Sequence, residues 1–297
     1  MKDKFVGAFL GLIVGDALGA PYEGMQRGEF QFNGELKRVG TDNIKAGQWT
    51  DDSSMALCLA ESLIDDGFNL KSQLNKYAEW FEHGHLSSKE RAFKIGRNTS
   101  LAITDFIKKS TLPPEREYAA GNGSLMRLAP VPLYFCNDFD KAVYYAKMSS
   151  LSTHNNIMAA DSCKFLGAFI YHALKNKSKE YLLESSFKKL DLDKRVLDKV
   201  KGNYKFKEKK DIISDAFVLN TLEASLWSFY QTDNFAAAIK KAINLGGDTD
   251  TVAAVTGQMA GAFYGRKEIL NKWINNLVKK KMIIQIITKL YQVKISE

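Results

Sequence analysis

Three side chains that carry oxygen stand together at Thr50-Asp51-Asp52, shortly before the apolar stretch 55–60. The apolar spacing behind them predicts a helix near residues 50–66, so both carboxylates fall in its first turn. One such side chain is enough to satisfy the free N–H groups of a helix and to suit its dipole. Three in succession exceed that need and indicate a further role.

A second acidic turn, Asp248-Thr249-Asp250-Thr251, follows a pair of glycines and leads into the apolar stretch 252–264. The glycines permit a tight turn, and two carboxylates two residues apart can point to one place. Carboxylates brought close together repel, and a bound divalent cation offsets that repulsion. All candidate ligands are oxygens, which favours Mg²⁺, Mn²⁺ or Ca²⁺ over Zn²⁺ or Cu²⁺. The two turns together therefore predict a metal site.

A glycine-rich loop, Gly121-Asn122-Gly123-Ser124, offers N–H groups to an anion such as phosphate. The motif is weak alone, because Gly-Asn-Gly is also a common turn and the Gly-Lys-Ser/Thr of a Walker A loop is missing. His154, one of 4 histidines, stands at a predicted helix start. A lone histidine there is more often structural than catalytic, so both interpretations stay open.

Apolar residues at spacings of three and four predict helices throughout, and no alternation of strand and helix favours a parallel sheet. No long linker divides the 297 residues, so we expect one compact all-α domain over residues 1–297. The expected helices lie near residues 50–66, 70–82, 94–109, 139–151, 155–175, 180–200, 214–230, 234–243, 249–264 and 267–290.

Glycines recur every fourth residue in two segments, Gly7–Gly19 and Gly257–Gly265. Such a ridge lets helix backbones approach closely. We expect both helices to pack tightly in the core, and each is the first candidate for the packing partner of the other. That packing would hold the acidic turns rigidly. The N-terminal segment also has the outline of a secretory signal, but the glycine spacing and Asp16 argue against one. We interpret it as a core helix too short to span a bilayer, and expect a cytoplasmic protein without a membrane partner.

The composition, with 45% hydrophobic and 26% charged residues, excludes collagen-like and disordered classes. A net charge of +8 permits anionic partners without demonstrating them. Residues 175–210 are rich in lysine and are interpreted as a solvated surface. Nucleic-acid contact is the alternative, but no known nucleic-acid-binding motif is present and we expect no such partner.

The 3 cysteines lack CxxC spacing, which favours buried free thiols over disulfides or a zinc site.

Five stretches, in this order along the chain, resemble the ADP-ribosylglycohydrolase family, which includes bacterial dinitrogenase reductase-activating glycohydrolases and eukaryotic ADP-ribosylarginine and ADP-ribosylserine hydrolases. Each stretch is weak alone, but the ordered set is highly specific. The resemblance implies an orthogonal helical bundle with a central cleft for two Mg²⁺ or Mn²⁺ ions. It also implies a monomeric enzyme that releases ADP-ribose from modified protein side chains or a related conjugate. The stretches are Gly11–Glu23, Trp49–Asp52, Gly121–Arg127, Thr153-His154 and Gly246–Gly265.

The same resemblance implies roles for individual residues. The ions would orient the ribose and lower the pKa of a water molecule, while a carboxylate takes its proton as the glycosidic bond breaks through an oxocarbenium-like state. The residues implied for proton transfer are Glu23, Asp51 and Asp52, and those for the metals are Thr50, Asp51, Asp52, Asp248, Asp250 and Thr251, with help from Glu23. Those implied for ADP-ribose are Gly96, Gly121, Asn122, Gly123, Ser124 and His154.

The sequence departs from the family pattern at Lys94, where many relatives carry an acidic residue near the substrate. The change bears on the rate or on the linkage cleaved, which the sequence leaves open among arginine, serine, a nucleobase and an O-acyl ester. One alternative is a non-catalytic module that binds ADP-ribose or another nucleotide. Another is a phosphatase of the DxDxT/V type at Asp248–Val252, but that site requires a preceding buried strand in an α/β fold.

Overall fold

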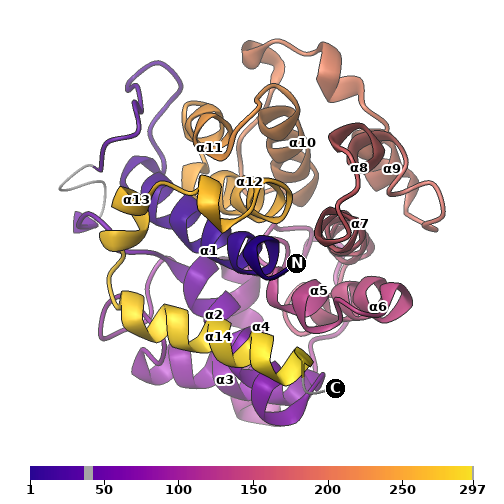
Figure 1. Cartoon of the computed structure of the whole chain (residues 1–297). Helices are drawn as coiled ribbons and strands as arrows, with labels where there is room; N and C mark the ends of the chain where they lie inside the picture. Colours follow the sequence, from indigo (N-terminus) through magenta and orange to yellow (C-terminus); the bar gives the residue numbers. More distant parts are fainter. Residues whose placement is uncertain (37–42, 296–297) are drawn as a thin grey trace.

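The computed structural model describes residues 1–36 and 43–295, and within them the fold is helical without a β-strand (Figure 1). This confirms the predicted all-α class. An isolated bridge pairs Gly121 with Phe217. The α-helices are α1 (Lys2–Gly19), α2 (Asp51–Asp66), α3 (Leu70–His83), α4 (Arg97–Lys109), α5 (Pro130–Tyr134), α6 (Phe139–Ser150), α7 (Ile157–Leu174), α8 (Lys179–Glu184), α9 (Lys194–Val200), α10 (Val218–Tyr230), α11 (Phe235–Ile243), α12 (Thr249–Tyr264), α13 (Asn271–Asn275) and α14 (Lys280–Ile295).

Two predicted helices are wrong because each is divided. The helix expected near 180–200 is α8 and α9, and the second begins where the Asp193 carboxylate accepts the N–H of Arg195 at 2.9 Å. The helix expected near 267–290 is α13 and α14, with a break at Lys279, whose φ is 53°. There the N–H of Val278 donates to the carbonyl of Gly47 at 2.9 Å, so a contact with a distant segment replaces a helical hydrogen bond.

Helices α1 and α12 pack antiparallel at the centre of the molecule (Figure 1). Their glycine ridges face each other, with Gly7 against Gly261 and Gly11 against Gly257. A methyl group added at Gly11 would lie 2.2 Å from the Gly257 carbonyl oxygen, so only glycine permits this approach. The prediction that the two glycine-rich helices pack against each other is confirmed.

This pairing brings the two predicted acidic turns together. Gly19 at the end of α1 lies against Thr249 at the start of α12, whose hydroxyl donates to the Gly19 carbonyl at 2.8 Å. The first turn of α2 is hydrogen-bonded to Asp16 of α1. The C-terminal end of α1 therefore meets the N-terminal ends of α2 and α12 at one place in the core.

The segment Lys2–Tyr22 is 21 residues long and passes a length-and-composition test for a membrane span, so the prediction that it is too short is wrong. Within its apolar 18-residue window, however, 94% of the segment is buried in the protein, where α12 and other helices cover it. That burial is what a core helix requires. The three cysteines are free and buried, as predicted.

Candidate active site

Asp16 connects α1 to the first turn of α2. Its carboxylate accepts the backbone N–H groups of Thr50 and Ser53 at 3.0 Å and the Ser53 hydroxyl at 2.5 Å. Neither Thr50 nor the acids that follow it cap α2, so Asp16 satisfies the free N–H groups from a neighbouring helix. Burial raises the pKa of Asp16 to about 6, although these hydrogen bonds oppose the rise.

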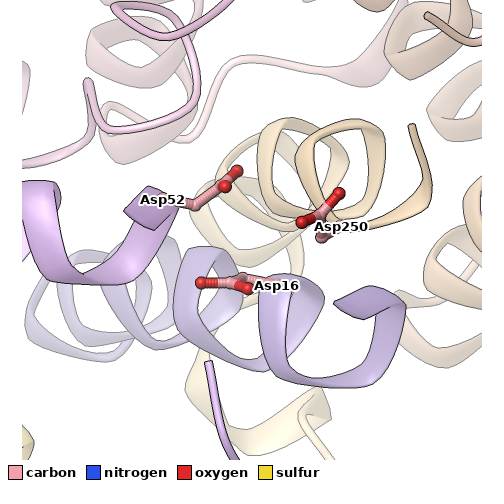
Figure 2. Close-up of side chains that lie close together, drawn as sticks. All are labelled: Asp16, Asp52 and Asp250. Carbon is pink, nitrogen blue, oxygen red and sulfur yellow. The ribbon is translucent and has the colours of Figure 1, made fainter. Parts of the chain in front are cut away.

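Figure 2 shows Asp16, Asp52 and Asp250 directed toward one another from α1, α2 and α12. Each offers a carboxylate oxygen, and these oxygens all lie within 4.8 Å of one another. The Thr50 hydroxyl lies 3.1 Å from Asp52 Oδ2 and 3.5 Å from Asp250 Oδ2. Asp52 Oδ1 is buried without a hydrogen-bond partner, although buried polar oxygens are normally paired. The cluster is therefore rich in negative charge and has an unsatisfied oxygen inside the protein.

The electrostatics of the cluster suit a cation. Burial raises the pKa values of Asp51, Asp52 and Asp250 well above their usual range, and repulsion from neighbouring carboxylates raises them further. A positive ion would relieve both effects, and an all-oxygen set of donors fits a hard divalent ion. Asp16 differs from the others, because N–H and O–H groups of α2 already occupy both of its oxygens. It positions the cluster.

A cavity of about 1210 Å³ opens beside these carboxylates. Most predicted site residues line it: Glu23, Asp51, Asp248, Asp250, Thr251, Gly96, Gly121, Asn122, Gly123 and His154. Asn122 connects the glycine-rich loop to the second acidic turn, because its Nδ2 donates to Asp248 Oδ2 at 2.7 Å. The structure thus brings together residues that are more than one hundred positions apart in the sequence.

Three predicted site residues lie behind the cavity wall. Thr50 and Asp52 are buried within the carboxylate cluster. Ser124 is also buried, and its hydroxyl lies 2.8 Å from Ser150 Oγ rather than in the cavity. The Ser124 side chain therefore does not line the cavity, and the part of Ser124 in substrate binding stays a prediction.

His154 and the glycine-rich loop form one packed unit. Methyl groups at Gly121 and Gly123 would lie 3.2 Å from His154 Nε2 and 2.7 Å from its Cε1, so both glycines make room for the imidazole. Arg127 donates to Thr153 Oγ1 at 2.7 Å, and that oxygen lies 2.8 Å from His154 Nδ1. Thr153 accepts from Arg127, and we assign its own proton to the bond with Nδ1, an assignment that makes Nε2 the ring N–H.

The protonation state of His154 follows from its surroundings. Burial lowers its pKa to about 3, and the neighbouring charge of Arg127 contributes. The ring is therefore neutral at physiological pH and can serve as a hydrogen-bond donor, not as an acid that exchanges its proton near neutrality.

Two features of the cavity were not among the predicted site residues. Lys94 Nζ lies 2.9 Å from Glu23 Oε2, and the Lys94 backbone has φ of 62°. Tyr118 and Phe217 line the cavity and are 64% and 38% exposed. In the sequence, Tyr118 and Phe217 are isolated aromatic residues, and nothing in their spacing relates them to the acidic turns. They could therefore not be predicted as cavity residues. Asp16 was visible as an acid within an apolar, glycine-rich helix.

Fold and site together define an all-helical protein with a buried oxygen cluster, suited to a cation, beside a large cavity. A family model described as ADP-ribosylglycohydrolase matches residues 1–296. The chain therefore belongs to the ADP-ribosylglycohydrolase family, as its sequence motifs predicted, and is a glycosyl-hydrolysing enzyme. The phosphatase interpretation is wrong, since no strand precedes Asp248 in the described part of the chain.

Individual relatives match this protein over nearly the whole chain. It is 36% identical to "ADP-ribosylarginine hydrolase Tri1" of Serratia proteamaculans (strain 568), covering 97% of this chain and 79% of that protein. It is 30% identical to "ADP-ribosyl-[dinitrogen reductase] glycohydrolase" of Rhodospirillum rubrum, covering 94% and 92%. A solved structure, "ADP-ribosylglycohydrolase-related protein complex", superposes with a TM-score of 0.86 at 35% identity, covering 99% of this chain and 98% of that one.

Proposed function

We propose that this enzyme releases ADP-ribose from ADP-ribosylated arginine side chains of proteins, with two divalent cations, Mg²⁺ or Mn²⁺, as cofactors. The bond cleaved is the one between the distal ribose and the guanidinium nitrogen. The observation that carries the proposal is the buried carboxylate cluster where three helix ends meet at the wall of a large cavity. We place the enzyme in the cytoplasm, because α1 belongs to the core and carries Asp16, and we propose that it is a monomer.

Both the relatives and the cavity support arginine as the modified residue. The Tri1 proteins of Serratia proteamaculans and Pseudomonas putida (strain GB-1), at 36% and 34% identity, are named ADP-ribosylarginine hydrolases. In this chain, Glu117 and Asp215 are exposed and line the cavity in addition to the carboxylates of the cluster. A guanidinium is a cation with several N–H donors, and an acidic surrounding favours it.

The residues proposed to hold the cations come from α2 and α12. Thr50, Asp51, Asp52 and Asp250 form one set of oxygens, and Asp248, Asp250 and Thr251 form the other, with Glu23 beside it. When bound, the cations supply positive charge that orients the ribose hydroxyl groups and makes a water molecule more acidic. Sharing Asp250 between the sets fits its position between Thr50 and the cavity.

Two carboxylates on the cavity wall are placed to accept the proton of the attacking water. Asp51 and Glu23 both line the cavity, whereas Asp52 is buried in the carboxylate cluster. Lys94 holds Glu23 through an ion pair of 2.9 Å, which fixes the orientation of that carboxylate. A carboxylate within reach of water lowers the barrier by taking the proton as the new carbon–oxygen bond forms.

The other part of the cavity is proposed to bind the diphosphate and the nucleoside. The N–H of Asn122 already donates to the Ala216 carbonyl at 3.1 Å, so the proposed donors of the loop are the N–H groups of Gly121 and Gly123, with His154 Nε2–H beside them. Tyr118 and Phe217 offer exposed aromatic faces for the adenine. These contacts place the distal ribose toward the carboxylate cluster.

A panel of linkages tests the proposal. The purified protein is incubated with Mg²⁺ or Mn²⁺ and with substrates ADP-ribosylated through arginine, serine, a nucleobase or an O-acyl ester, and free ADP-ribose is measured. We expect release from the arginine substrate, none in chelator, and none from the Asp250→Ala variant. Asp193→Asn, which removes a carboxylate outside the cavity, should behave as wild type. Tight ADP-ribose binding without release from any substrate would instead identify a binding module.

A further inference from the structure

A second cavity of about 630 Å³ lies between the segment that precedes Lys210, α10 and α11, and it shares no lining residue with the active site. Its volume is in the range of about 300–1000 Å³ typical of small-molecule sites. We call it the lysine groove, after the residues that dominate its lining: Lys207, Lys209, Lys240 and Lys241, with Glu208 and Trp227 beside them.

The acids near the lysine groove already have partners. Glu208 is paired with Lys210 at 2.9 Å on the surface. Glu223 is paired with Lys207 at 2.7 Å and with Lys199 at 2.9 Å. One of the four groove lysines is therefore neutralised by a buried carboxylate.

The other three groove lysines, Lys209, Lys240 and Lys241, have no such partner. Within residues 1–36 and 43–295, none of them forms an ion pair with a carboxylate. The groove thus carries an uncompensated positive charge, unlike the paired lysines on the surface around it.

The positive charges of Lys241 and Lys209, which both line the groove, repel each other. The Lys241 ammonium lies over the Trp227 ring, 4.6 Å from its centroid, in a partly buried position. Burial lowers the pKa of Lys241, and the positive charge of Lys209 lowers it further. An anion bound in the groove would relieve this repulsion, and the ammonium groups that line the groove can donate charge-assisted hydrogen bonds to it.

The groove is held in shape before any ligand arrives. Arg27 donates from its guanidinium to the carbonyl groups of Lys209 and Ile212, and its Nε donates to the Leu245 carbonyl at 3.0 Å. The indole N–H of Trp227 donates to the Lys207 carbonyl at 3.0 Å. Because these contacts fix the backbone on one side and the aromatic wall on the other, binding would cost little ordering of the protein.

We propose that the lysine groove is a binding site for a small phosphate-bearing anion, separate from the active site. Uncompensated ammonium groups on the groove wall recognise the charge of the ligand. Trp227 is only 3% exposed and Lys241 covers its ring, so no free aromatic face is available to stack the bases of a nucleic acid. The phosphate has two possible sources, free inorganic phosphate or a nucleotide.

Calorimetric titration of the Mg²⁺-loaded protein with inorganic phosphate, and separately with AMP, tests the proposal. ADP-ribose is added at one equivalent per active site, so that it fills the active site without occupying the groove. This condition rests on the proposed function and is verified first by titrating ADP-ribose alone, which must show a single site. We expect one phosphate site per chain, with an affinity that falls as salt is added. Equal affinity for the two probes indicates inorganic phosphate as the source, and tighter binding of AMP indicates a nucleotide.

Two matched variants separate the groove from general surface charge. Lys241→Met keeps the aliphatic stem and should weaken phosphate binding about tenfold, as loss of one charge-assisted contact implies. Lys189→Met removes an equal charge from an exposed position outside the groove and should change binding less than about twofold. Thermal unfolding verifies that both variants fold. The proposal is overturned if no phosphate binds with ADP-ribose present, or if both variants weaken binding equally.

Discussion

Replacing Asp16 by asparagine should weaken divalent-cation binding without a matching loss of stability in the metal-free protein. Asn has the same shape but only one carbonyl oxygen, and its amide N–H groups would face the N–H and hydroxyl donors of Ser53. The first turn of α2 would shift, and with it Asp51 and Asp52. Loss of a residue that orients metal ligands typically lowers metal affinity about 10- to 100-fold.

The expected change in stability is a balance of two effects. Two donors of Ser53 lose a charged acceptor at 3.0 and 2.5 Å, which costs roughly 3–6 kcal/mol. In the other direction, a pKa raised from 3.8 to about 6 means that the buried charge of Asp16 destabilises the native state above its unfolded pKa, by about 3 kcal/mol at neutral pH. The neutral amide removes that cost, so we expect a net loss of only about 0–3 kcal/mol.

Asp161→Asn provides the matched control. Asp161 is a buried carboxylate whose polar partners lie outside the active-site cavity. It is ion-paired with Lys147 at 2.8 Å and accepts the N–H of Asp193 at 2.7 Å. Breaking a buried pair costs about 2–4 kcal/mol, here reduced because Lys147 is partly exposed. This variant should lose stability and keep its cation affinity.

The two variants are compared by calorimetric titration of Mg²⁺ and Mn²⁺ and by urea unfolding of metal-free and metal-saturated protein. With a tenfold loss of affinity, the stabilisation by a fixed excess of cation should fall by up to about 1.4 kcal/mol per site in Asp16→Asn. Wild-type cation affinity in Asp16→Asn, or an equal loss of affinity in Asp161→Asn, would refute the positioning role.

Three further perturbations have direct expectations. Gly11→Ala would place a methyl group 2.2 Å from a carbonyl oxygen of α12 and should cost about 1–3 kcal/mol or more in urea unfolding. In Gly96→Ala the added methyl group meets nothing within 4 Å, so this variant should not lose stability in urea unfolding. His85→Gln should cost about 0.5–1 kcal/mol near pH 6 and little near pH 8, because a hydrogen bond with Glu61 raises the His85 pKa and the stabilisation is lost as pH rises through it. Equal costs at both pH values would contradict that ion pair. Thr153→Val removes the hydroxyl that bonds the neighbouring imidazole and should weaken ADP-ribose binding about five- to tenfold at unchanged cation affinity.

Local sequence signals predicted those parts of the fold that depend on local chemistry. The amphipathic spacing placed α2, α3, α6, α7, α11 and α12 within a few residues of their observed bounds. The glycine spacing predicted the central pair, because a methyl group has no room where two backbones touch. The two acidic turns were recognisable because their oxygens exceed what helix capping requires.

The features that were missed depend on contacts between distant segments. Nothing near Lys279 in the sequence indicates that Val278 would donate to Gly47 and so interrupt a helix. Likewise, Ser124 belongs to a promising loop, but its direction is set by Ser150 of α6. Asp16 could be recognised as an unusual buried acid, whereas its partners on α2 became known only from the fold.

The close packing of α1 and α12 also explains how the carboxylate cluster is maintained. Like charges in a buried site would normally separate, and such a movement would require α1 and α12 to slide or part. Backbone contact at Gly11 and Gly257 leaves no flexible side chain to absorb that movement, so the carboxylates stay close, and their repulsion adds to the burial that raises the pKa values of Asp52 and Asp250. A cation that binds there relieves repulsion that the scaffold has already enforced, instead of first having to assemble its ligands. The glycine ridges and the acidic turns are thus two parts of one site, because the rigidity of the first holds the charges of the second together.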